Sequence, residues 1–198
     1  MTMAREGPVP DDRAPLRLRD GTPVRIRPTR RQDRGAVDAF LRTLSLDSFE
    51  LRYFSAVQAE IALEQILAQD PRGDEVSVLM EVVGTSPATV IAQAEYARDP
   101  HDRQRAEVAF LVSDAHQGQG AATLLLWDLA RRARAQGVTT FTARVLPENF
   151  PMRSVFTGAG FPCGLEYFQG ETEVTLDVRD EPHLGLIPWM PRAQHAAP

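Results

Sequence analysis

The residues best suited to bind a ligand lie in a glycine-containing turn that leads into an apolar helix pattern. The sequence TLLLWDLARRA follows this turn at helical spacing. Glycine and alanine let a ligand come close to the backbone, and the first turn of a helix has N–H groups without intrahelical partners. Such a turn is suited to bind an anion such as a pyrophosphate, although a plain tight turn has the same composition. Its residues are Gln117, Gly118, Gln119, Gly120, Ala121 and Ala122.

Two other kinds of phosphate-binding loop are excluded by the sequence. A nucleoside-triphosphate loop needs Gly-Lys-Ser/Thr, and this chain has no lysine, since all 22 of its basic residues other than histidine are arginine. A dinucleotide fingerprint opens a parallel strand–helix–strand unit with GxGxxG spacing. Gly118, Gly120 and Ala122 do not reproduce that spacing, and the turn follows a predicted antiparallel meander.

The elements that must position this turn alternate between strand and helix patterns. Alternation of apolar residues predicts strands, helical spacing predicts helices, and the turns GTSP and DPHD separate three consecutive strands. We expect a mixed α/β fold with a mostly antiparallel central sheet and helices on both faces. The predicted strands are 24–29, 75–83, 88–98, 105–114, 139–146, 164–169 and 172–178, and the predicted helices are 33–44, 62–70, one that begins at about 121, and 149–159.

Length and composition favour one domain without a membrane span. The chain has 198 residues, and we expect tails at 1–15 and 181–198 around a single domain at 16–180, with Leu186, Ile187 and Trp189 as candidates to pack. Neither a long apolar run nor a signal peptide is present, which predicts a cytoplasmic location. A net charge of −5 argues against general nucleic-acid binding. We read the eight arginines between Arg13 and Arg34 as a solvated basic face.

Two motifs in the right order resemble the GCN5-related N-acetyltransferase (GNAT) family. The acyl-CoA motif Gln/Arg-x-x-Gly-x-Gly/Ala is matched by Gln117, Gly120 and Ala122, and the resemblance extends over 16–178. A second signature, Asn-x-x-Ala/Met followed by an aromatic residue and Gly-Phe, is matched by Asn149, Met152, Phe156, Gly160 and Phe161. Within the family, the chain is similar to the catalytic domains of bacterial Pat-type protein lysine acetyltransferases. That resemblance rests on the opening LRDGTPVRIRPTRRQD and on AEVAFLVSDAHQGQGAATLLL.

The resemblance implies acetyl-CoA as co-substrate, held where two strands splay apart. Backbone groups of Leu111 and Val112 would pair with the pantetheine arm. Asn149 would hold the pantetheine or the departing sulfur, and Met152 and Phe156 would complete the binding site. The pyrophosphate would bind the backbone amides of Gln119, Gly120, Ala121 and Ala122.

The same resemblance implies Glu107 as the general base. Acetyl transfer needs a neutral amine as nucleophile, so a base must accept a proton. Glu107 alternates with apolar neighbours on the strand that leads to the turn, and partial burial there would raise its pKa toward a useful range. Alternatively, Glu107 is a carboxylate at the edge of a strand, paired with Arg98 or Arg105. Glu95 on the preceding strand is the reserve candidate.

Phe156 departs from the pattern of many family members, which have a tyrosine there that can protonate the leaving thiolate. Phenylalanine cannot donate a proton, so an amide, a water or another residue such as His116 would have to assist. His116 more readily caps or packs at the turn. Cys163 is read as a small packing residue rather than an acyl carrier, and we expect no metal site.

Three classes of function follow from these features. The first is acetylation of a lysine side chain on a protein, such as an acyl-CoA synthetase, by direct attack in a ternary complex. The second is acetylation of a small amine, which an acidic acceptor pocket would favour. The third is a CoA-binding module without catalysis, for which Phe156 is the sequence argument. The chain is expected to be a monomer or a homodimer.

Overall fold

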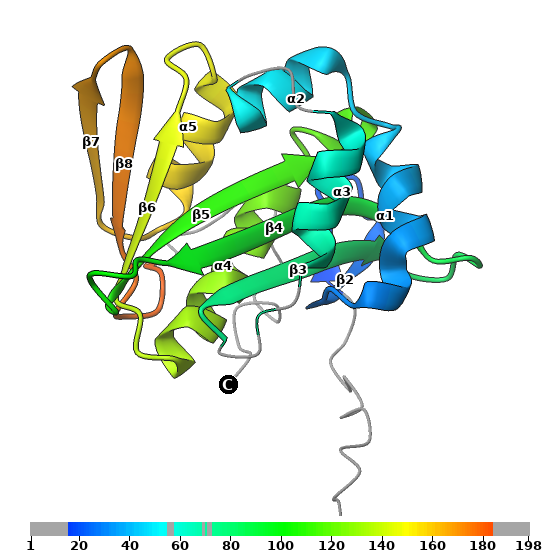
Figure 1. Cartoon of the computed structure of the whole chain (residues 1–198), viewed down its shortest axis with the longest axis horizontal. Coiled ribbons are helices and arrows are strands. Elements are labelled where there is room, and N and C mark those ends of the chain that lie inside the picture. Colours follow the sequence, from blue (N-terminus) through cyan, green and yellow to red (C-terminus); the bar gives the residue numbers. More distant parts are fainter. Residues whose placement is uncertain (1–15, 55–57, 69, 71–72, 184–198) are drawn as a thin grey trace, which may run out of the picture.

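A computed structural model describes residues 16–54, 58–68, 70 and 73–183. Its centre is an eight-stranded sheet in the order β1-β2-β3-β4-β5-β6-β8-β7, with helices on both faces (Figure 1). The predicted tail 1–15 and residues 184–198 of the other predicted tail lie outside the described residues. The strands are β1 (Leu16–Arg17), β2 (Pro23–Pro28), β3 (Glu75–Val82), β4 (Thr89–Arg98), β5 (Arg105–Val112), β6 (Thr140–Val145), β7 (Cys163–Phe168) and β8 (Glu171–Asp177).

Helices on the two sides of the sheet enclose two hydrophobic clusters. α1 and α3 pack with Leu79, Val90 and Leu111 on one face. α4 and α5 pack on the other face, against alternate residues of the same strands such as Val108 and Phe110. Because the side chains of a strand alternate between faces, one strand serves both clusters. The helices are α1 (Arg34–Leu41), α2 (Leu46–Tyr53), α3 (Ala59–Leu67), α4 (Ala121–Ala135) and α5 (Phe150–Gly158), and there are short 3₁₀ turns at Arg31–Asp33 and Asp114–His116.

The predicted mixed, mostly antiparallel architecture is confirmed. Every neighbouring pair of strands is antiparallel except β5 and β6, which run parallel. Two elements were not predicted, the two-residue β1 and the helix α2. The helix predicted at 62–70 is α3, which begins and ends three residues earlier. It ends at Leu67, the last buried residue of its apolar side, because Ala68 is already extended. None of the described helices has the length and apolar character needed to cross a bilayer.

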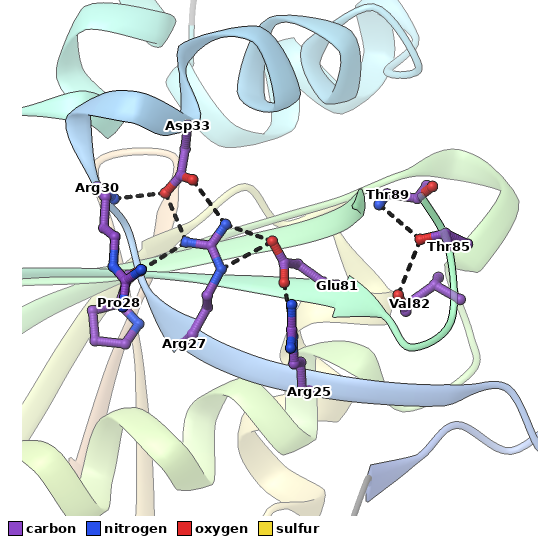
Figure 2. A network of polar contacts seen from close by, with 9 residues as sticks. All are labelled: Arg25, Arg27, Pro28, Arg30, Asp33, Glu81, Val82, Thr85 and Thr89. Carbon is purple, nitrogen blue, oxygen red and sulfur yellow. Dashed lines mark hydrogen bonds and ion pairs between the residues drawn. The ribbon is translucent and has the colours of Figure 1, made fainter. Parts of the chain in front are cut away.

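A buried ion-pair network fastens β2 to β3 and to the start of α1 (Figure 2). The Arg27 guanidinium donates to Glu81 at 2.5 and 2.9 Å and to Asp33 at 2.7 and 2.8 Å. Arg25 Nε adds a bond of 2.9 Å to Glu81, and the Arg30 N–H adds one of 2.7 Å to Asp33. The side chains of Glu81 and Asp33 are only 1% and 8% exposed. Because both carboxylates are buried, water cannot easily replace Arg27 as their hydrogen-bond donor.

Candidate active site

A cleft of about 660 Å³ opens between β5, β6, α2, α5 and the turn before α4. Clefts that bind small molecules commonly have volumes of roughly 300 to 1,000 Å³. The cleft brings together eleven of the twelve predicted site residues. Those in its lining are Glu107, Leu111, Val112, Gln117, Gly118, Gly120, Ala121, Ala122, Asn149, Met152 and Phe156.

The cleft exists because β5 and β6 separate. Their parallel pairing covers three residue pairs and ends with Glu107 opposite Thr142. On its other edge β5 stays paired with β4 as far as Val112. Beyond Glu107 the two strands diverge (Figure 1). Beyond Glu107, the edge of β5 that faces β6 is therefore available to hydrogen-bond an extended ligand.

The glycine-containing turn presents backbone amides at the start of α4. Gly118 and Gly120 have φ angles of +70° and +90°, and Gly120 is the N-cap residue. A residue with a side chain rarely adopts this left-handed conformation, which explains glycine at both positions. The first N–H groups of α4 have no partner within the helix, so this end of the cleft can bind an anion. Gln119 is the predicted residue outside the lining, and its carbonyl accepts a bond of 3.0 Å from the Arg19 N–H.

The Gln117 side chain joins the turn to α2. Its Nε2 donates to Ser48 Oγ at 3.1 Å, to the Val112 carbonyl at 3.3 Å and to Asp114 Oδ1 at 3.3 Å. The carboxylate of Asp114 in turn accepts from Ser48 Oγ at 2.7 Å and from the Ser45 N–H at 3.1 Å. Burial raises the pKa of Asp114, but the bonds from Ser48 and Ser45 outweigh it and lower the pKa below its usual value. The wall of the cleft formed by α2 is thus bonded to the turn.

Sequence reasoning missed Ser45, Ser48 and Asp114 because it did not predict α2. One local signal was present. Ser45 is the N-cap residue of α2, and its side chain accepts a bond from the Ser48 N–H at 3.2 Å. Serine is among the preferred residues at that position.

α5 forms the opposite wall, and its N-terminus is capped by Asn149. Asn149 Oδ1 accepts a bond of 3.1 Å from the Met152 N–H. Phe156, further along α5, is 1% exposed, and its ring meets Phe110 edge-on, with centroids 6.0 Å apart. Phe156 therefore belongs to the packed floor beneath the cleft.

Glu107 lies where the two strands part, with its side chain 56% exposed. The expected partial burial is not observed. Its partner is Arg144 of β6, at 3.7 Å from Nε, and not Arg98 or Arg105. Arg144 also lies 3.9 Å from Glu171, and its guanidinium is 5.9 Å from the centre of the Phe54 ring. A long, exposed ion pair such as that of Glu107 and Arg144 is weak.

The other candidates have different surroundings. Glu95 lies outside the cleft lining and is held by Arg52 at 2.5 Å and by Gln93 Nε2 at 2.9 Å. His116 lines the cleft, and its Nδ1 is 3.3 Å from Ser113 Oγ. Cys163 also lies outside the lining, and burial raises the pKa of its thiol. Among these carboxylates, Glu107 is therefore the one that faces the cleft.

The arrangement suits a long ligand with an anionic end and a reactive end. Amides at the start of α4 can hold phosphate oxygens, and the open edge of β5 can bond the amides of a pantetheine arm. The apolar floor includes Phe110 and Phe156. Glu107 stands at the other end, where a carboxylate can accept a proton. These residues fit acetyl-CoA.

Comparisons with known proteins agree with this geometry. The acetyltransferase (GNAT) family model matches residues 40–161, which is more than half of the chain. Acetyltransferase Pat from Mycolicibacterium smegmatis is 34% identical over 102 residues, a match that spans 52% of this chain and 29% of that protein. The chain thus matches less than a third of this curated relative.

Solved structures similar to this chain include acyltransferases. The GNAT domain of S. lividans PAT has a TM-score of 0.72 at 32% identity, over 83% of this chain and 96% of that one. A cAMP-binding acyltransferase from Mycobacterium smegmatis has a TM-score of 0.59 at 26% identity, over 90% of this chain and 50% of that one. The chain therefore belongs to the acetyltransferase (GNAT) family, whose members take an acetyl group from acetyl-CoA.

Proposed function

We propose that this protein transfers the acetyl group of acetyl-CoA to a lysine side chain of a protein acceptor. One observation carries the proposal: Glu107 faces the cleft in which the amides of the glycine-containing turn also lie. The choice of a protein lysine is supported by the similarity to acetyltransferase Pat and to the GNAT domain of S. lividans PAT.

The proposed binding of acetyl-CoA uses the two open features of the fold. Of the two residues predicted to pair with the pantetheine arm, Val112 has its backbone groups at the unpaired edge of β5, and it pairs with the arm there, whereas those of Leu111 face β4. The amides of 119–122 hold the pyrophosphate at the start of α4. Asn149 lies beside the pantetheine or the sulfur, with Met152 and Phe156 below it.

The proposed chemistry is direct attack of the acceptor amine in a ternary complex. Acetyl-CoA supplies the thioester carbonyl. The Glu107 carboxylate takes a proton from the acceptor ammonium, directly or through a water, so that the nitrogen has a free lone pair. The new carbon–nitrogen bond forms as the carbon–sulfur bond breaks, the nitrogen gives its second proton to water, and CoA leaves as a thiolate. Since Phe156 has no proton to give, the leaving sulfur takes one from water or from a polar group of the lining such as His116.

The cleft favours a protein lysine over a small polycationic amine. Glu107 is the one carboxylate among the described lining residues, whereas Arg19, Arg52 and Arg144 contribute positive charge. A small polyamine would require an acidic pocket to offset the loss of its hydration. A lysine on a protein can instead draw on contacts outside the cleft.

The test is mass spectrometry of a purified acyl-CoA synthetase after incubation with acetyl-CoA and this protein. We expect an added acetyl group on a specific lysine, and loss of that product with Glu107→Gln while acetyl-CoA still binds. Glu166→Gln is the matched control because Glu166 is an exposed carboxylate of β7 outside the cleft lining. Equal product with Glu107→Gln would refute the assignment of the base. Absence of product with acetyl-CoA bound would refute this acceptor.

A further inference from the structure

The hairpin of β1 and β2 lies directly on the glycine-containing turn. The Arg19 N–H donates to the Gln119 carbonyl at 3.0 Å, and Arg19 Nη1 donates to the Gly118 carbonyl at 3.2 Å. Arg19 also lines the cleft, although 99 positions separate it from Gly118 in the sequence. An exposed arginine from the other end of the domain is thus brought to the rim of the proposed phosphate site.

This arginine is held in place by its neighbours. Leu18 is 3% exposed and is part of the main core. Its N–H donates to the Thr22 carbonyl, and its carbonyl accepts from the Gly21 N–H, both at 3.0 Å. A group fixed before binding loses less conformational entropy when the ligand arrives. The backbone of Arg19 is therefore pre-organised beside the turn.

The turn has no positively charged side chain of its own. Residues 117–122 carry no formal charge, and the protein has no lysine. The described lining of the cleft contains three arginines, Arg19, Arg52 and Arg144. Arg19 is the lining arginine that contacts the turn. The bond from Arg19 Nη1 to the Gly118 carbonyl places a cation beside the turn.

We propose that Arg19 binds the phosphate groups of acyl-CoA and so completes the anion site of the turn. The inference rests on the proposed acyl-CoA site. Guanidinium groups form strong charge-assisted bonds with phosphate oxygens. The neighbouring Asp20 is an opposing charge, but its carboxylate accepts a bond of 2.9 Å from the Thr22 N–H and lies near His116.

Arg19→Gln removes the charge, leaves a shorter polar side chain, and keeps the backbone bond to Gln119. Calorimetric titration should show a roughly tenfold weaker Kd for acetyl-CoA, the size of one charge-assisted bond at an exposed site. Arg19→Lys should lose less, because it keeps the charge. Arg17→Gln is the matched control, since Arg17 lies on the same hairpin outside the cleft lining, and it should bind as the wild type does.

Three ligands separate the phosphate contact from a change in folding. Acetyl-CoA, acetyl-dephospho-CoA and acetyl-pantetheine differ in their phosphates, and ligand-observed NMR can follow the weak third ligand. A loss confined to acetyl-CoA assigns the contact to the 3′-phosphate, and an equal loss for both CoA forms assigns it to the pyrophosphate. An equal loss for acetyl-pantetheine, or no loss at all, overturns the proposal.

A separate variant, Gly120→Ala, strains the turn itself and tests the proposed acyl-CoA site independently of Arg19. If Gly120→Ala weakens acetyl-CoA binding and Arg19→Gln does not, the role of Arg19 is wrong and the site stands. If neither variant changes the affinity, the site in the turn is also wrong.

Discussion

Replacing Arg27 by methionine should destabilise the fold strongly. Arg27 makes four hydrogen bonds to two buried carboxylates, and its side chain is 19% exposed. In Arg27→Met, Glu81 keeps its bond from Arg25, and Asp33 keeps its bond from the Arg30 N–H. Breaking a buried ion pair costs about 3 to 5 kcal/mol. Because Arg27 is partly exposed, we expect a loss near the lower end, about 3 kcal/mol in the free energy of unfolding.

Urea unfolding followed by circular dichroism measures this loss, and Arg25→Met is the control. Arg25 also bonds Glu81, but its side chain is 56% exposed, so solvent screens the interaction. We expect its removal to cost less than about 1 kcal/mol. Equal losses in the two variants would refute the claim that burial makes the network around Arg27 strong. So would a loss below about 1 kcal/mol in Arg27→Met.

The pH dependence provides a second check on the same network. Burial raises the pKa of Glu81 and Asp33, but the hydrogen bonds and charge of Arg27, together with those of Arg25 at Glu81 and Arg30 at Asp33, outweigh burial and leave both pKa values below normal. A carboxyl with a lowered pKa in the folded state stabilises the protein above its unfolded pKa of about 4. That contribution is lost as pH falls through the folded pKa. The difference between wild type and Arg27→Met should therefore be largest near neutral pH and shrink in acid.

Three further substitutions test other parts of the cleft. Asp114→Asn weakens the bonds to Ser48, so hydrogen exchange in α2 should rise while the global stability changes by less than about 1 kcal/mol; unchanged exchange would contradict the link. Phe156→Ala should cost about 3 to 5 kcal/mol in urea unfolding because the ring is 1% exposed, and a loss near zero would place the ring outside the core. Trp127→Phe removes the bond of 2.9 Å to the Ala159 carbonyl and should cost about 1 kcal/mol, and a stable variant would show that water replaces it.

The strands and the turn could be predicted because their signals are local. Alternation of apolar residues indicated β3 to β6, and glycine followed by a helical pattern indicated the start of α4. Helix α2 was missed because LDSFELRY buries a single side chain, Phe49. Asp114, which accepts bonds from Ser45 and Ser48, and Gln117, which donates one to Ser48, add to its stability from more than sixty positions away. Propensity and periodicity contain no information about such contacts.

For a similar reason, the sequence could not predict which residues contact the site residues. Glu107 and Arg144 meet only because β5 and β6 pair in parallel, and the sequence does not give that register. Arg19 meets Gly118 across 99 positions. Residue type and spacing predicted which groups could react. The tertiary fold determines what lies beside them.

The short pairing of β5 with β6 also bears on how the molecule opens. Three residue pairs join β5 to β6, whereas six pairs join β6 to β8 and seven join β4 to β5. We therefore expect the ladder of β6, β8 and β7 to open as a unit, because its pairing with the remaining sheet is short. Native-state hydrogen exchange should show this unit opening at a lower free energy than β3 to β5. A ligand bridging the diverging strands would raise that opening free energy by mass action, so acetyl-CoA would act as a folding cofactor of the C-terminal half.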